Sequence, residues 1–227
     1  MKFLFKYATR SRPEWFKQTM ILYQENLSGK HDCQFVVSCD RDDETMQTGD
    51  IRNFVAKWSN IEMCFGWNRS KIQAINADIA GREFDILFVV SDDMEPVVKG
   101  FDNAISHDMR REWPSLDGAL RYNVGLYDEH DIATLSILGR RLYDHFGYVY
   151  WPGYQSVWCD NEFTDLVRSW SRFTFLDEVL VKHAWRPNAY SDELCVRDDK
   201  NWPYDEALYK LRKEAGFPGA PHPIEKT

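Results

Sequence analysis

The sequence has 227 residues and a mass of 26.8 kDa, enough chain for one α/β domain with a sizeable core. Hydrophobic residues make up 44% and aromatic residues 15%, and this composition excludes an intrinsically disordered chain. The formal net charge of -8 at pH 7 disfavours general binding to the phosphate backbone of a nucleic acid. A nucleic-acid acceptor or partner therefore has no support from charge.

The five cysteines occur singly and never as a Cys-x-x-Cys pair. This usage predicts reduced thiols in a cytoplasmic protein rather than a disulfide scaffold or a zinc site. The N-terminal apolar run meets Lys6 and then Arg10 too early for a secretion signal. No stretch approaches the ~20 consecutive apolar residues that a membrane-spanning helix needs. We therefore expect a cytoplasmic protein without a membrane span.

The first hundred residues alternate between apolar runs and helical patterns. Runs that predict strands cover residues 3–8, 33–39, 61–65 and 84–90. Helical patterns follow the first three runs and begin near Pro13, Asp50 and Ser70. Strands that alternate with helices predict an α/β fold with a mainly parallel central sheet flanked by helices.

The second half is less regular. Expected strands cover residues 124–128, 146–151 and 175–182, and expected helices cover residues 133–145 and 160–169. From Asp198 onward the chain is polar, and residues 216–227 form a tail that is rich in proline and glycine at its start. No linker divides the chain, so we expect a single domain over residues 1–215, followed by that tail.

Polar residues follow each of the four predicted strands of the first half. These segments are residues 9–12, 40–44, 66–71 and 91–95. Ligand sites of open α/β sheets lie at the carboxyl ends of the strands. The four segments are therefore expected to form one site.

Asp92 and Asp93 directly follow the most apolar predicted strand. Two adjacent carboxylates repel each other unless a positive group, such as a divalent ion, lies nearby. Oxygen ligands of this kind suit Mg²⁺ or Mn²⁺, which commonly bridge to substrate phosphates. The alternative is a solvated turn with a capping aspartate, and the position at a strand end favours the metal site.

Acidic and basic residues flank this pair at the same predicted edge. Asp40 ends the second strand, where a carboxylate can accept hydrogen bonds from a base or a ribose, whereas Asp42 equally fits an acidic turn before a helix. Asn68 and Lys71 flank a helix N-terminus that favours anions, so Lys71 is a candidate contact to a diphosphate or base. Arg10 and Arg12, which each alone would be ordinary surface cations, lie at the same rim.

Three further residues of the second half carry candidate chemistry. His183 follows an apolar run, and a neutral imidazole is a good ligand for Mn²⁺, although a lone histidine near aromatic residues is more often structural. Asp160 and Glu162 lie in the first turn of a predicted helix, where either side chain is a candidate general base or a capping group. Aromatic residues gather just before this helix, where they can stack on sugar rings or bases or form core.

Four segments together resemble the nucleotide-diphospho-sugar glycosyltransferases of the GT-A fold, nearest to the family-two type. The matching segments are residues 9–13, 38–43, 68–76 and 84–94. The last of them resembles the metal-binding Asp-x-Asp element of that family, but it reads Ser-Asp-Asp, so the first carboxylate of the strict motif is absent. The similarity covers residues 3–100 well and the remainder loosely.

The resemblance implies a role for each candidate residue. Asp93 corresponds to the metal-binding carboxylate, with His183 completing the metal site and Asp92 close to the ribose or the ion. The segment of Thr9, Arg10, Ser11 and Arg12 corresponds to nucleoside contacts, as does Asp40. Residues 1–100 would form a nucleotide-binding half, and residues 101–215 an acceptor-binding half.

These expectations define a metal-dependent glycosyltransferase that uses Mn²⁺ or Mg²⁺. It would move a sugar from a nucleotide-diphosphate donor, with a UDP-sugar expected, to a hydroxyl-bearing acceptor. Asp160 or Glu162 would take the acceptor proton, and the sugar would be transferred with inversion. A nucleotidyltransferase with a similar sheet and a non-catalytic nucleotide- or glycan-binding domain are the alternatives. The turn after the first strand contains no glycine, which counts against the nucleotidyltransferase.

Overall fold

The computed structural model describes residues 1–125, 132–184 and 193–224 and shows one α/β domain. Its main sheet has seven strands in the order β3-β2-β1-β4-β7-β6-β8. The strands of this sheet are β1 (Lys2–Thr9), β2 (Asp32–Asp40), β3 (Ile61–Gly66), β4 (Ile86–Val90), β6 (Ala119–Tyr122), β7 (Ile137–Gly139) and β8 (Phe173–Leu176). Strands β1 to β4 run parallel, and β7 runs antiparallel to both β4 and β6. The predicted α/β fold with a mainly parallel sheet is confirmed.

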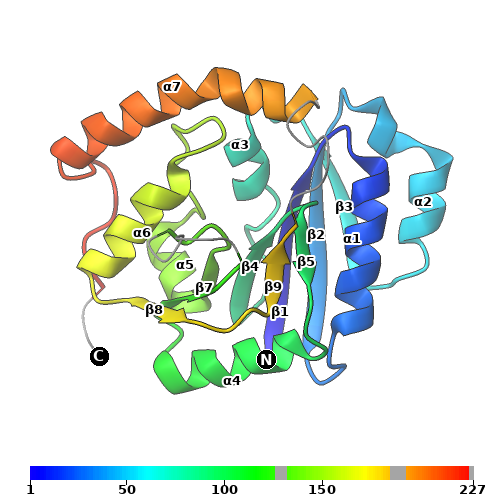
Figure 1. Cartoon of the computed structure of the whole chain (residues 1–227), viewed down its shortest axis with the longest axis horizontal. Coiled ribbons are helices and arrows are strands. Elements are labelled where there is room, and N and C mark those ends of the chain that lie inside the picture. Colours follow the sequence, from blue (N-terminus) through cyan, green and yellow to red (C-terminus); the bar gives the residue numbers. More distant parts are fainter. Residues whose placement is uncertain (126–131, 185–192, 225–227) are drawn as a thin grey trace.

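Helices cover both faces of this sheet (Figure 1). The helical elements are α1 (Pro13–Asn26), the 3-10 helix η1 (Glu44–Gln47), α2 (Gly49–Val55), α3 (Lys71–Asn76), α4 (Phe101–Glu112), α5 (Arg140–Phe146), α6 (Cys159–Ser169) and α7 (Glu193–Glu214). Because side chains alternate along a strand, Phe3 and Phe5 pack with α1, α2 and α4, whereas Leu4 packs with α3, α5 and α6. Helix α7 extends along the same side as α3 and α6 in Figure 1.

A second, two-stranded sheet pairs β5 (Met94–Pro96) with β9 (Val181–His183) in antiparallel register. Met94 lies opposite His183 in this pair. The pairing therefore carries a residue from late in the chain to the end of β4.

The helix predicted over residues 133–145 is wrong, because this segment contains β7 followed by the shorter α5. Strand β7 inserts between β4 and β6 by antiparallel pairing, an interaction that no local sequence pattern contains. At Gly139 the backbone lies so close to its neighbour that an added Cβ would come within 2.4 Å of the Leu116 carbonyl oxygen. Tertiary contact thus decided the conformation of this segment.

The strand predicted over residues 146–151 is also wrong. Helix α5 ends at Phe146, and Gly147 follows with φ at 71°. The amides of Val149 and Tyr150 then donate to Oδ1 of Asn76, at 2.9 and 3.1 Å, instead of joining a strand ladder. An amide side chain has taken the place of a strand partner.

The late segments differ from prediction as well. Residues 175–182 do not form one strand, because β8 joins the main sheet and β9 joins β5. The polar region after Asp198 belongs to helix α7. Residues 216–224 pack on the domain, with Ile224 only 8% exposed. The strand expected over residues 124–128 lies largely outside the described residues, and β6 ends before it at Tyr122.

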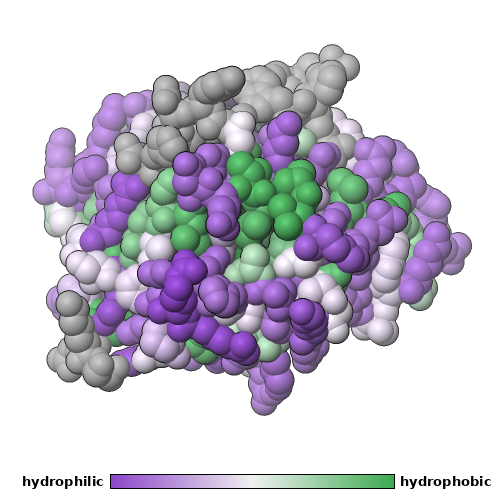
Figure 2. Space-filling view, turned by 60° about the horizontal axis from the view of Figure 1, so that its bottom comes forward, coloured by the Kyte–Doolittle hydropathy of each residue, from purple (hydrophilic) through white to green (hydrophobic). Residues whose placement is uncertain are grey.

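The described part of the chain contains no helix that is long and apolar enough to cross a membrane. The face shown in Figure 2 carries a group of hydrophobic residues near its middle, with hydrophilic residues around it. Cys33, Cys39, Cys64 and Cys159 are free thiols.

Candidate active site at the carboxyl edge of the sheet

Asp93 and His183 face each other at the end of β4. Oδ2 of Asp93 lies 3.3 Å from Nε2 of His183, and the two side chains remain 30% and 26% exposed. The backbone holds this pair together, because the amide of Ala184 donates to the carbonyl of Asp93 at 2.7 Å. The register of β5 with β9 places the imidazole beside the carboxylate.

The Asp93 carboxylate is held in its ionised form. Burial alone would raise its pKa, but the hydrogen bond and charge of His183 outweigh that effect. The Ser91 hydroxyl donates to Oδ1 at 2.6 Å, and Lys71 adds a positive charge. The pKa of Asp93 therefore lies below its ordinary value, and the side chain is available as an anionic ligand near pH 7.

Asp92 has a different environment from its neighbour. It is only 2% exposed, and its oxygens accept hydrogen bonds from Tyr7 Oη at 2.8 Å and Thr9 Oγ1 at 3.1 Å. Thr19 Oγ1 donates to its backbone carbonyl at 2.7 Å. Burial raises the pKa of Asp92 to about 7, against the opposing effects of the Tyr7 hydrogen bond and the Arg12 charge. Asp92 thus ties the turn after β4 to β1 and α1.

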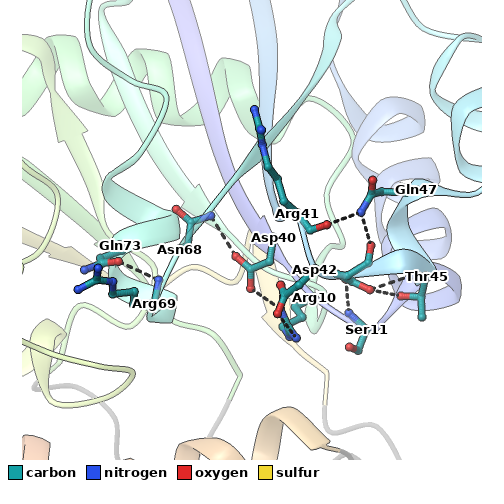
Figure 3. Close-up of polar contacts among 11 residues, drawn as sticks. Arg10, Ser11, Asp40, Arg41, Asp42, Thr45, Gln47, Asn68, Arg69 and Gln73 are labelled. Atoms are coloured by element: carbon teal, nitrogen blue, oxygen red, sulfur yellow. Dashed lines mark hydrogen bonds and ion pairs between the residues drawn. The ribbon is translucent and has the colours of Figure 1, made fainter.

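Figure 3 shows a polar cluster at the ends of β1, β2 and β3. Arg10 donates through Nη1 to Asp40 at 2.9 Å, and it binds both oxygens of Asp42 at 2.6 and 3.2 Å. Asn68 Nδ2 donates to the other oxygen of Asp40 at 3.0 Å. Asp40 is 6% exposed, so these contacts fix its carboxylate in place.

Two cavities adjoin at this edge and share Ala8, Lys71, Ser91 and Asp93. The smaller has a volume of about 80 Å³, and the polar or charged residues found only in its wall are Thr9, Arg10, Arg12, Asp40, Ser70, Asp92 and Arg197. The larger has a volume of about 370 Å³, and the polar, charged or tryptophan residues found only in its wall are Thr134, Tyr150, Ser156, Trp158, Asp160, Asn161, His183 and Trp202. Asp93 lies where the cavities meet.

The two predicted base candidates lie in different surroundings on α6. Asp160 lines the larger cavity, and one of its oxygens accepts the Asn161 amide at 3.1 Å. Glu162 does not line either cavity. It is 2% exposed, Arg212 donates to both of its oxygens at 2.7 Å, and Tyr154 Oη donates at 2.8 Å. The geometry thus favours Asp160, because it lines a cavity, whereas Glu162 is buried in an ion pair between α6 and α7.

The fold brings most of the predicted site residues together. Those that line a cavity are Thr9, Arg10, Arg12, Asp40, Lys71, Asp92, Asp93, Asp160 and His183. Asn68 and Asp42 do not line either cavity, but they contact residues that do. Asn68 donates to Asp40, and Asp42 accepts from Arg10. Ser11 donates its amide to Asp43 at 2.8 Å instead of facing a cavity.

Sequence reasoning missed the residues that α7 contributes. Arg197 lines the smaller cavity and Trp202 lines the larger one. Both lie in a polar segment that contains Pro203, and proline is disfavoured inside a helix. The sequence therefore did not predict helix α7. The sequence signal for a ligand contact here was a tryptophan, Trp202, within so polar a stretch.

A divalent metal fits the Asp93–His183 pair if a bound ligand and water supply the remaining oxygen atoms. No group of three or more His, Cys, Asp or Glu side chains within residues 1–125, 132–184 and 193–224 is arranged to hold an ion alone. One carboxylate and one imidazole supply two ligands, and Mg²⁺ or Mn²⁺ sites commonly draw the rest from substrate phosphates and water. The pair therefore suits an ion that binds together with a phosphorylated ligand.

No family model matches the sequence, and no curated protein matches it. Solved structures do. A mannosyltransferase from Pyrobaculum calidifontis in complex with GDP-Man and Mn²⁺ is 13% identical, with a TM-score of 0.66 over 98% of this chain and 66% of that chain. A fragment of TarS from S. aureus in complex with UDP-GlcNAc is also 13% identical, with a TM-score of 0.63 over 82% of this chain and 59% of that chain.

A more distant likeness is to 4-diphosphocytidyl-2C-methyl-D-erythritol synthase from Anaerococcus prevotii. It is 8% identical, with a TM-score of 0.53 over 78% of this chain and 86% of that chain. This chain spans about 60% of the TarS fragment and 66% of the mannosyltransferase. The strand order, the paired sheets and these likenesses agree on one conclusion. The chain shares the GT-A-type α/β fold of these glycosyltransferase structures.

Proposed function

We propose that this chain is a metal-dependent glycosyltransferase that moves a sugar from a nucleotide-diphosphate donor to a hydroxyl acceptor. The observation that carries the proposal is the Asp93–His183 pair at the junction of a cation-lined cavity and a larger cavity whose wall contains the Asp160 carboxylate. A donor needs its diphosphate at such a junction, with the nucleoside on one side and the sugar on the other.

We assign the nucleotide to the smaller cavity on the chemistry of the groups in its wall. Asp40 offers a fixed carboxylate to a base or ribose, and Arg10 and Arg12 lie at the same rim. Lys71 and Arg197 supply positive charge for the diphosphate, through charge-assisted hydrogen bonds. A UDP-sugar is the proposed donor, since TarS is described in complex with UDP-GlcNAc and with UDP. Residues 1–100 form most of this half, and α7 adds Arg197.

Asp93 and His183 would hold Mn²⁺ or Mg²⁺ together with the donor phosphates. When bound, the ion supplies Lewis-acid neutralisation of the charge that develops on the leaving diphosphate. The Lys71 ammonium, which lines both cavities, assists that neutralisation from the protein side.

Asp160 acts as the general base in this proposal. Its carboxylate takes the proton of the acceptor hydroxyl while the acceptor oxygen forms a bond to the anomeric carbon. The bond from that carbon to the diphosphate oxygen breaks, and the nucleoside diphosphate leaves with the electron pair. Attack from the side opposite the leaving group inverts the anomeric configuration.

The first test removes the charge of Asp93 while keeping its shape. Asp93→Asn should lower the affinity for UDP-sugars in the presence of Mn²⁺ by at least about tenfold, because the amide is a poor metal ligand. Isothermal titration calorimetry with and without Mn²⁺ measures this loss. Asp50→Asn, at an exposed aspartate of α2 that pairs with Lys17, is the control and should bind like the wild type. Metal-dependent binding that survives in Asp93→Asn contradicts the proposal.

The likeness to the diphosphocytidyl-erythritol synthase keeps a nucleotidyltransferase as a second candidate. The turn from Thr9 to Pro13 lacks the glycine-rich phosphate loop typical of that class. The products separate the two reactions. A nucleotidyltransferase releases pyrophosphate from a nucleoside triphosphate and a sugar phosphate, whereas a glycosyltransferase releases a nucleoside diphosphate from a nucleotide sugar. A non-catalytic domain would bind the nucleotide sugar and release neither product.

A further inference from the structure

Two tryptophan side chains, Trp158 and Trp202, line the larger cavity. Their rings lie edge to face, with centroids 5.7 Å apart and an interplanar angle of 74°. Trp202 is 49% exposed, although a large apolar side chain is normally buried. Trp158 also packs on Tyr209 at 5.2 Å, which backs its ring from α7. The two rings form an aromatic corner that lines the larger cavity.

The backbone around Trp158 is held in an unusual conformation. Trp158 has φ at 62°, a left-handed value that a bulky residue rarely adopts and that its surroundings must hold in place. The preceding loop is fixed by Asp205, which is fully buried and accepts the amides of residues 155, 156 and 157 at 2.8 to 2.9 Å. Ile72 binds the carbonyl of Gln155 on the other side, at 3.4 Å. Helix α7 and helix α3 therefore hold the turn that presents Trp158.

The same turn presents Asp160, two residues further on. A ring that stacks on the tryptophan corner is thereby held beside the proposed base. The indole Nε1 of Trp158 is buried and has no hydrogen-bond partner among the described residues.

The rest of the wall offers hydrogen bonds but little positive charge. Ser156 and Asn161 lie close to the corner in the chain and line the same cavity. Among the described residues that line it, Lys71 is the one lysine or arginine, and it also faces the donor cavity. Among those described residues, a phosphorylated or otherwise anionic acceptor would meet no lysine or arginine besides Lys71. A neutral ring with an apolar face and a hydroxylated edge matches both the aromatic and the polar groups.

We propose that Trp158 and Trp202 form the acceptor subsite and that it takes a neutral pyranose ring, so that the acceptor is a glycan or glycoside. This inference rests on the proposed glycosyl transfer and specifies its acceptor class. The volume of about 370 Å³ lies at the small end of the range of ligand sites, so the cavity admits a donor sugar and little more than one acceptor ring. In the transfer step, a ring hydroxyl gives its proton to Asp160 and its oxygen to the anomeric carbon, while the nucleoside diphosphate departs.

The experiment measures acceptor binding without turnover. Saturation-transfer difference NMR is recorded on the full chain with Mn²⁺, UDP and methyl β-D-glucopyranoside, methyl β-D-galactopyranoside or methyl N-acetyl-β-D-glucosaminide. At least one pyranoside should receive saturation at its ring C–H protons, whereas glycerol and glycerol 3-phosphate should not. Trp202→Ala should weaken binding of that pyranoside by at least about tenfold, by loss of a stacking face. Trp202→Phe should keep most of the affinity.

Tyr204→Ala is the matched control. Tyr204 lies on the same helix, is 55% exposed and does not line the cavity, so its removal should leave pyranoside binding unchanged. Preferred binding of glycerol or glycerol 3-phosphate, or unchanged affinity in Trp202→Ala, overturns the acceptor assignment. Donor binding is titrated separately on the same samples. Donor binding without pyranoside binding leaves the proposed function standing and removes this inference. Pyranoside binding without binding of any donor contradicts the proposed transfer itself, and with it the assignment of the sugar site as an acceptor subsite.

Discussion

Asp92 and Asp93 are adjacent carboxylates with opposite environments. Tyr7 and Thr9 occupy the oxygens of Asp92 in the buried interior, and burial raises its pKa to about 7. His183 and Ser91 hold Asp93 in its ionised form at the cavity wall. One carboxylate therefore anchors the turn after β4, and the other is left for the ligand. Separate environments of this kind assign different roles to neighbouring acids.

A buried lysine of β1 gives a pH-dependent prediction. Lys6 is fully buried, its ammonium donates to Ser38 Oγ, and Ser38 in turn binds Asp78. Burial lowers the pKa of Lys6 to about 8 from an unfolded value of 10.5, although the charge of Asp78 opposes that shift. Below pH 8 both states carry the proton and the cost of burying the charge is fully present. Between about pH 8 and 10.5 the unfolded state binds more protons, so the free energy of unfolding should rise with pH.

The measurement compares wild type with Lys6→Met, because other groups also titrate in this range. Urea unfolding at pH 7.5, 8.5 and 9.5 should show the wild type gaining stability relative to the variant as pH rises. The full gain by pH 10.5 is roughly 3 kcal/mol. A relative loss over the same range would mean that Asp78 stabilises the charged lysine more than burial destabilises it.

Among the elements, α7 has the widest reach across the site. Its N-terminal part lines the smaller cavity through Arg197, Trp202 lines the larger one, and Asp205 fixes the loop before α6. Arg212 then anchors the helix through its buried ion pair with Glu162. Figure 1 shows this helix extending across α3 and α6. The walls of the two cavities thus share one element.

The two acidic residues of α6 should respond differently to amide substitution. Asp160→Asn should lower the rate of transfer by about 10²–10⁴-fold without changing donor affinity, because it removes the proposed base. Glu162→Gln should instead destabilise the fold, by up to about 3–5 kcal/mol, because Arg212 loses its buried counter-charge. Transfer kinetics at saturating donor and urea unfolding separate the two effects. A rate loss confined to Glu162→Gln, with stability intact, would move the base to Glu162.

At the scale of the whole molecule, ligand binding couples to stability. The site draws on β1, β2, β4, α3, α6, β9 and α7, so a donor bound at the cavity junction contacts both halves of the chain. A ligand that binds only the folded state stabilises it by about 2.7 kcal/mol at a concentration 100 times its Kd.

A UDP-sugar at this concentration with Mn²⁺ should therefore raise the Tm by roughly 5–10 °C. Differential scanning fluorimetry of a panel of nucleotide sugars measures the shift and identifies the donor. Addition of EDTA should abolish it, because Asp93 and His183 would hold the ion on which the proposed donor binding depends. A shift of equal size in EDTA would show that the nucleotide binds without the ion.

The sequence by itself determined the first half of the molecule. Four apolar runs that alternate with helical patterns specify parallel strands, and the polar residues that follow them specify one shared edge. Asp93, Asp40 and Lys71 could be selected for this reason alone, because each lies within a few residues of a strand end. Local pattern suffices where the elements are consecutive in chain and neighbours in space.

Only the tertiary structure decided the second half. Strand β7 exists through its pairing with β4, and residues 149–150 are turned by the side chain of Asn76. The choice of Asp160 over Glu162 depended on Arg212, fifty positions from Glu162 along the chain. The partnership of Asp93 with His183 depended on the register of β5 with β9. Each of these contacts joins residues far apart in sequence, so no local periodicity records them, and the three-dimensional packing alone determines which side chains meet.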